Sequence, residues 1–197
     1  MPARSVSRPA PSQRAHQGEY VDDDLKPIAD KALSWGVLDV RCIPTRSIVV
    51  AEWVRLKCRY GCPNYGRRLD CPPNEFTLDL TRRLLAEYRR ALVLQLRRLA
   101  RSQPEGSGLV HRVERELFLS QFYRAFAIGA GSCGECVDEC VREAGRCPQP
   151  HRIRPAGESM GIDWFATLRN AGWDLRVLPD RQQAGGLPPS YSLVLVD

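Results

Sequence analysis

Apolar residues recur at helical spacing in four stretches of the chain. After Thr77, a residue type that often caps a helix, Leu80, Leu84 and Tyr88 lie four apart and would share one helix face. In the last stretch, Asp163 is the expected N-cap. The four helices are expected over residues 25–35, from residue 77 onward, over 109–128 and over 163–171.

Strand patterns lie between these helices. Residues 47–57 begin with β-branched residues and then alternate, which predicts a strand that leaves the core at Cys58. Residues 91–96 form a nearly continuous apolar run, typical of a buried strand that could pair in parallel with the first. Two further strands are expected over 173–178 and 191–196. This alternation indicates an α/β sandwich with a mixed sheet of about four strands.

The length of 197 residues fits one domain that can bury a core without disulfides. We expect residues 1–24 to be a disordered tail, because the N-terminus is rich in Pro, Ser, Arg and Ala, and residues 25–197 to form a single α/β domain. No apolar run approaches the ~20 residues that span a bilayer, and no signal-peptide core is visible. We therefore expect a cytoplasmic protein without membrane contact.

The net charge of +6 comes almost entirely from arginine. Because the arginines are interleaved with acids, as over residues 112–116, we interpret them as solvated pairs on helix faces and do not expect nucleic-acid binding. The acidic triplet at residues 22–24 is interpreted as the negatively charged start of a helix rather than as a metal site.

Seven of the eight cysteines fall into two groups. The first cysteine group is Cys58, Cys62 and Cys71, and the second cysteine group is Cys133, Cys136, Cys140 and Cys147. Three thiols of the second group could form one helix face, but the surrounding glycines disfavour a helix. A disulfide framework needs a secretory context that the sequence does not indicate. Metal ligation is therefore favoured for the second cysteine group, whereas Cys42 is expected to be a small buried hydrophobe.

The spacing of the second cysteine group, C-x2-C-x3-C-x6-C-P, is closer to a ferredoxin motif than to paired zinc knuckles. Proline follows three of the cysteines, as Pro63, Pro72 and Pro148, and a proline also follows the last ligand in bacterial iron–sulfur motifs. Both metals accept four thiolates, so zinc stays open as the alternative to a 4Fe–4S cluster.

The segment WVRLKCRYGCPNYGRRLDCPP, continued by TRRLLAEYRRAL, resembles the family called domain of unknown function 2284, which is described as predicted metal-binding proteins. The second cysteine group agrees, because it is followed by Arg154-Pro155, Glu158 and residues 161–163 (GID) in the family's order. The resemblance covers about residues 45–165 and implies an α/β domain with one or two four-iron clusters, held by the seven grouped cysteines and not by Cys42.

One departure from the family pattern concerns histidine. Gln149 stands where the family often has a histidine after its last cysteine, so a histidine ligand is unsupported there. His151 is close in sequence, but four thiols already suffice.

Three functions fit these residues. The first is an iron–sulfur protein that transfers electrons to, or serves as an accessory of, a protein redox partner or client enzyme. The second is a zinc-stabilised interaction module, and the third is an enzyme whose cluster binds substrate at an iron without a protein ligand. No phosphate-binding glycine loop and no catalytic constellation around a histidine is recognisable, so enzymatic activity is left open.

Cys42 is not expected to complete the first cysteine group. A strand over residues 47–57 would be about 36 Å long and would separate Cys42 from Cys58. The other seven thiols would then divide as four and three, leaving one iron open, or would supply one shared cluster with spare cysteines.

Overall fold

Strand β2 (Arg90–Leu96) lies inside a four-stranded sheet with the order β1-β2-β4-β3. The computed structural model describes residues 21–73, 76–97, 105–133, 136, 140, 146–175 and 188–197. The other strands are β1 (Asp39–Pro44), β3 (Phe126–Ile128) and β4 (Ser190–Leu195), and all three pairings are antiparallel. The predicted α/β class and a sheet of four strands are confirmed, although only the strands expected over residues 91–96 and 191–196 are among the four. The predicted mixed sheet and the parallel pairing suggested for residues 91–96 are wrong, because every pairing is antiparallel.

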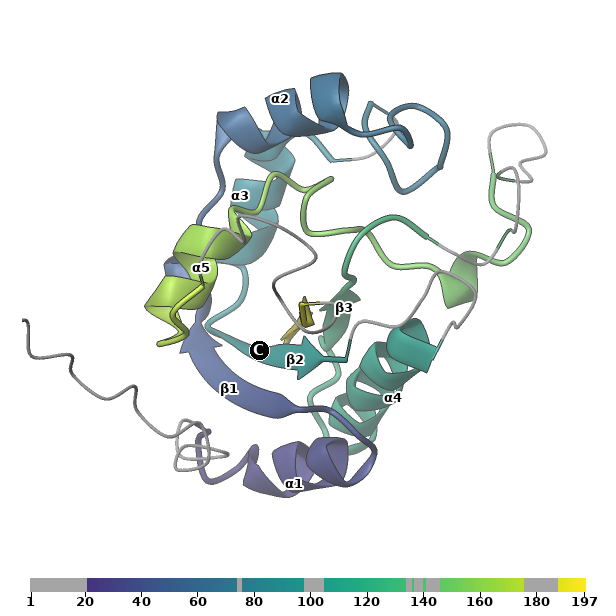
Figure 1. Ribbon diagram of the computed structural model, residues 1–197. Coiled ribbons are helices and arrows are strands. Elements are labelled where there is room, and N and C mark those ends of the chain that lie inside the picture. Colours follow the sequence, from purple (N-terminus) through teal and green to yellow (C-terminus); the bar gives the residue numbers. More distant parts are fainter. Residues whose placement is uncertain are drawn as a thin grey trace, which may run out of the picture.

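Helices cover both faces of this sheet, which explains the continuous apolar run of β2 (Figure 1). Leu92 and Leu94 face a core shared with α1 (Lys26–Ser34) and α4 (Glu105–Leu119). Val93 faces the opposite core, to which α3 (Leu78–Ala86) and α5 (Trp164–Asn170) contribute. Because successive strand residues point to opposite faces, both sets must be apolar when both faces are covered.

The predicted helix caps are present. Thr77 Oγ1 accepts a hydrogen bond from the backbone N–H of Leu80 at 3.1 Å, and Asp163 Oδ1 accepts one from Ala166 N–H at 3.0 Å. The helix after Thr77 buries Leu78 and Leu85, so its apolar face is displaced from the predicted one, and Leu80 is exposed. The predicted first helix and last strand are confirmed as α1 and β4.

The strand predicted over residues 47–57 is wrong. Only Val50 forms an isolated bridge, with Ile162, and the chain then enters α2 (Glu52–Gly61). In this helix Val54 is buried while Trp53, Leu56 and Tyr60 are exposed. The alternation of apolar residues therefore does not indicate a strand here, because most of these residues do not face the core.

The helix predicted over residues 109–128 is too long. Helix α4 ends at Leu119, Gln121 adopts a left-handed φ of 75°, and the last residues of the range form β3. Phe122 and Ala125 still pack on the core beneath α4, so the apolar spacing continues after the helix has ended. Residues 173–175, the described part of the strand predicted over 173–178, are not in a strand.

Several charged residues make contacts between distant elements, although the sequence suggested that they were solvated. Asp22 and Asp24 bind the Arg90 guanidinium at 3.0 and 2.9 Å. On α4, Glu114 binds Arg154 at 2.8 Å and Glu116 binds Lys31. The predicted N-terminal tail lies mostly outside the described residues. None of the helices in the described part of the chain has the length and apolar character needed to cross a bilayer.

Candidate metal centre

The cysteines of both groups lie at or near the ends of regular elements or on the loops that follow them. Cys58 is in the last turn of α2 and Cys62 is its C-cap residue, whose N–H donates to the Cys58 carbonyl at 3.3 Å. Cys133 follows β3, and Cys147 precedes the short 3₁₀ turn η2 (Pro150–Arg152). Cys71 lies in the loop between α2 and α3.

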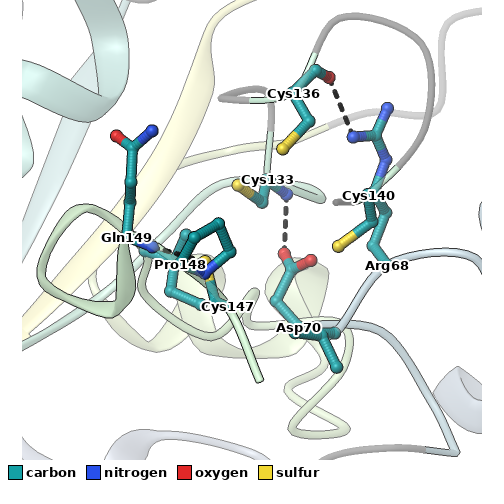
Figure 2. Close-up of a pocket in the computed structure, with 10 residues that line it drawn as sticks. Arg68, Asp70, Cys133, Cys136, Cys140, Cys147, Pro148 and Gln149 are labelled. Carbon is teal, nitrogen blue, oxygen red and sulfur yellow. Dashed lines mark hydrogen bonds between the residues drawn. The ribbon is translucent and has the colours of Figure 1, made fainter. Parts of the chain in front are cut away.

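The second cysteine group lines one small cavity. Figure 2 shows the thiols turned toward a common space beside Asp70 and Arg68. The cavity measures about 20 Å³, which is room for one water-sized body. Its wall consists of Arg68, Leu69, Asp70, Cys133, Cys136, Cys140, Cys147, Pro148, Gln149 and Ile153.

Three hydrogen bonds hold this cavity in shape (Figure 2). Gln149 N–H donates to Cys147 Sγ at 3.3 Å, and Arg68 Nη1 donates to the Cys136 carbonyl at 2.9 Å. Cys133 N–H donates to Asp70 Oδ2 at 2.6 Å. Burial raises the pKa of the Asp70 carboxyl, against the opposing effect of this bond. N–H donors at cysteine sulfur and a cation nearby are the outer contacts that orient ligands and tune a metal centre.

The first cysteine group lines a second and larger cavity of about 470 Å³. Burial first, and then the charges of Asp70, Cys62 and Cys58, raise the pKa of the Cys71 thiol to about 12. Burial also raises the pKa of Cys58. These two thiols are therefore protonated at neutral pH without a metal, and a metal must displace their protons. The wall consists of Trp53, Val54, Lys57, Cys58, Cys62, Tyr65, Cys71, Pro72, Gly131, Ser132, Ala156, Glu158, Ser159, Ile162, Trp164 and Phe165.

The two cavities share a wall. Asp70 lines the smaller cavity and the next residue, Cys71, lines the larger one. In the same way Ser132 lines the larger cavity and Cys133 the smaller one. The bond from Cys133 N–H to Asp70 joins these two pairs, and Asn64 Nδ2 donates to Ser132 Oγ at 2.9 Å. The seven thiols thus divide into four and three on either side of one partition.

Cys42 lines neither cavity. It lies on β1, packs against the core shared with α1 and α4, and its sulfur is 3.7 Å from Asp22 Oδ2. The sequence argument that a long strand separates Cys42 from Cys58 does not hold, because most of the residues predicted to form that strand belong to helix α2. The position of Cys42 on the sheet, apart from both cavities, now supports the same expectation.

Several contacts at the site were not anticipated from the sequence. Arg68 and Asp70 lie in the loop of the first cysteine group, where the sequence places them, but they contact the second group. Glu158 lines the larger cavity, and its Oε2 is buried without a hydrogen-bond partner among the described residues. The motif after Cys147 was the available signal for Glu158. His151 is exposed on η2 and lines neither cavity.

A family model described as "Predicted metal-binding protein (DUF2284)" matches residues 41–196, which include all seven grouped cysteines. No curated protein and no solved structure matches the chain. Within the described residues, no three His, Cys, Asp or Glu side chains are grouped closely enough to hold a single metal ion.

Proposed function

The chain belongs to the DUF2284 family of predicted metal-binding proteins, and from this premise we propose that it is an iron–sulfur protein whose second cysteine group holds a 4Fe–4S cluster. The observation that carries the proposal is that four thiols from one loop line a single cavity. Thiolates are soft ligands that suit iron–sulfur clusters, and four of them complete a cluster of this type. We further propose that the first cysteine group holds a second cluster.

The spacing of the cysteines along the sequence favours a cluster over a single zinc ion. C-x2-C-x3-C-x6-C-P is closer to a ferredoxin motif than to paired zinc knuckles, and a proline follows the last cysteine as in bacterial iron–sulfur motifs.

The smaller cavity supports zinc as the second candidate. Its volume of about 20 Å³ suits one ion, so a cluster would require the thiols to rotate outward. We favour the cluster, because side-chain rotation is permitted for cysteines on loops and metal sites commonly form only as the metal binds.

The residues around the smaller cavity would serve the cluster in definite ways. When bound, a cluster of this type supplies one-electron transfer. The Gln149 N–H bond to Cys147 Sγ and the positive charge of Arg68 both favour the more negative, reduced state. Pro148 covers the cavity beside Cys147 and limits access of water.

We propose that the partner is an acidic redox protein or client enzyme in the cytoplasm, where thiols stay reduced. The exposed side of α2 supports this, since Trp53, Leu56 and Tyr60 are 45%, 57% and 78% exposed and lie on the helix that carries Cys58. Lys57 and Arg59 on the same helix add positive charge. An apolar patch with cationic neighbours is suited to an acidic partner.

Anaerobic purification with quantification of iron, acid-labile sulfide and zinc tests the proposal. We expect brown protein with iron and sulfide in equal amounts and little zinc. Cys136→Ser should lose the cluster of the second cysteine group, whereas the matched Cys42→Ser change should retain it. Colourless protein with stoichiometric zinc would overturn the iron–sulfur proposal and favour the zinc-stabilised module.

A further inference from the structure

Glu158 is a carboxylate without an assigned role in the larger cavity. Its Oε2 is buried and has no hydrogen-bond partner among the described residues. The same cavity is lined by the three thiols of the first cysteine group. Buried polar atoms are nearly always satisfied, and the binding of an ion is one of the accepted explanations for an exception.

Donor side chains in this region do not satisfy Glu158 Oε2. Arg55 Nη1 donates to the carbonyls of Phe76 and Ser159, and the Ser159 hydroxyl donates to the Ala156 carbonyl at 2.7 Å. Lys57 also lines the larger cavity but forms no hydrogen bond to this oxygen.

The backbone holds Glu158 firmly beside the thiols. Gly161 N–H donates to the Glu158 carbonyl at 3.1 Å, and Ile162 N–H donates to the Gly157 carbonyl at 2.9 Å, which closes a tight turn. The sulfur of Cys58 is 3.8 Å from the same Glu158 carbonyl. The turn also packs closely at Gly157, because a Cβ there would meet the Trp164 ring at 2.4 Å. The backbone that carries the Glu158 side chain is therefore held in place before any metal binds.

The donor atoms at this cavity point the same way. Three cysteine sulfurs and the Glu158 carboxylate line one space. Thiolate and carboxylate are both ligand types that proteins offer to iron. A metal centre bound there could use the three sulfurs and Glu158 Oε2 together.

We propose that Glu158 is the fourth protein ligand of the cluster held by Cys58, Cys62 and Cys71. Its carboxylate oxygen binds the iron that no thiolate reaches. This inference rests on the proposed function, since it takes the first cysteine group to hold an iron–sulfur cluster. It replaces the open iron that three cysteines alone would leave. Iron accepts carboxylate as well as thiolate ligands in proteins.

The test compares Glu158→Gln with the parent and with Lys57→Gln, which changes a side chain of the same cavity that is not a proposed ligand. All three proteins also carry Cys136→Ser, so that the cluster of the first cysteine group is observed alone. Each is purified anaerobically, assayed for iron and sulfide, and oxidised with ferricyanide as the electron acceptor. A [4Fe–4S]²⁺ cluster that gives up one electron and one Fe²⁺ leaves a [3Fe–4S]⁺ cluster, which is paramagnetic and visible by EPR.

We expect the Glu158→Gln protein to lose about one iron per cluster on oxidation and to show the three-iron EPR signal, because its fourth iron lacks an anionic ligand. The reference protein and Lys57→Gln should keep their iron and stay EPR-silent. Should Glu158→Gln fail to fold by circular dichroism, Glu158→His is used instead. A histidine supplies a ligating nitrogen and should retain the fourth iron, which a role in packing alone would not explain.

Iron in the reference protein with no difference in Glu158→Gln would overturn this inference and leave the proposed function intact. Iron in the protein without any substitution, but none in the protein that carries only Cys136→Ser, would show that the first cysteine group holds no cluster. This result would also overturn the inference about Glu158. Zinc in place of iron in the parent would overturn both proposals.

Discussion

Replacing Gly161 by alanine should destabilise the turn that carries Glu158 to the larger cavity. Gly161 has a φ of +78°, in the left-handed region that favours glycine. Its carbonyl accepts a hydrogen bond from Ala51 N–H at 2.9 Å, which fixes the turn to the start of α2. An added Cβ would lie 2.1 Å from Leu78 Cδ2 and 3.6 Å from the Ala51 carbonyl oxygen.

Two effects add to the expected loss of stability. A non-glycine residue in the left-handed region costs about 1 kcal/mol. Inserting a methyl group into packed space costs about 1–3 kcal/mol, and the lower part of this range applies because Leu78 Cδ2 is the end of a flexible side chain. We therefore expect the free energy of unfolding to fall by about 2–3 kcal/mol.

Urea unfolding of parent and variant at equal metal loading measures this difference. Gly36→Ala is the matched control, since Gly36 also has a positive φ, of +105°, but has no heavy atom within 4 Å of an added Cβ. The control should lose only the backbone cost of about 1 kcal/mol. Equal losses in the two variants would refute the steric part of the reasoning, and Leu78→Ala should rescue Gly161→Ala if that part is correct.

Three further predictions concern other parts of the molecule. Arg90 lowers the pKa values of the Asp24 and Asp197 carboxyls. Their ion pairs with Arg90 therefore stabilise the fold above the unfolded pKa near 3.8, and this stabilisation is lost as the pH falls through the folded pKa. In denaturant titrations, the free energy of unfolding should drop less between pH 6 and about pH 3 for Arg90→Ala than for the parent protein. Arg154→Ala leaves the buried carboxylate of its partner on α4 uncompensated and should cost about 3 kcal/mol in the same assay, with a loss below about 1 kcal/mol contradicting this. Burial raises the pKa of Cys42 to about 12, so this thiol should stay protonated and should not bind iron. The Cys42→Ser protein should therefore contain as much iron as the parent protein, whereas a loss of about half the iron would show that Cys42 is a ligand.

The elements that sequence predicted well are those fixed by local signals. Thr77 and Asp163 cap helices because a side-chain oxygen three residues upstream of an unpaired N–H satisfies it in any context. The run over residues 91–96 is a central strand because only a doubly covered strand is apolar on both faces. Neither conclusion depends on distant residues.

The errors occurred where apolar residues serve something other than the nearest core. In α2 the exposed Trp53 lines the larger cavity, so its apolar character reports a site rather than a buried strand. Phe122 and Ala125 pack on the same core as α4 although Gln121 has already ended the helical path. The spacing of apolar residues indicates which of them reach the core, but it does not determine whether the backbone between them is helical.

The candidate site divides in the same way. Cysteine spacing predicted that the thiols would gather in two groups, and the structure places these groups around two cavities. Asp70 and Cys133 are 63 residues apart, and Cys58 and Glu158 are 100 apart. No local pattern predicts such contacts, since they arise from the way β3, α2 and the turn before α5 come together. The unpaired oxygen of Glu158 is visible only after folding.

The partition between the cavities connects the two proposed clusters. Asp70 and Cys71 are adjacent in the chain yet face opposite cavities, and Asp70 also binds Cys133 N–H. Charges separated by so thin and buried a wall interact strongly, because the effective dielectric constant inside proteins is far below that of water. If both proposed clusters are bound, reduction of one would add a negative charge beside the other and would make its reduction less favourable. Two clusters placed in this way would therefore accept electrons one after the other, which suits a protein that passes single electrons to a partner.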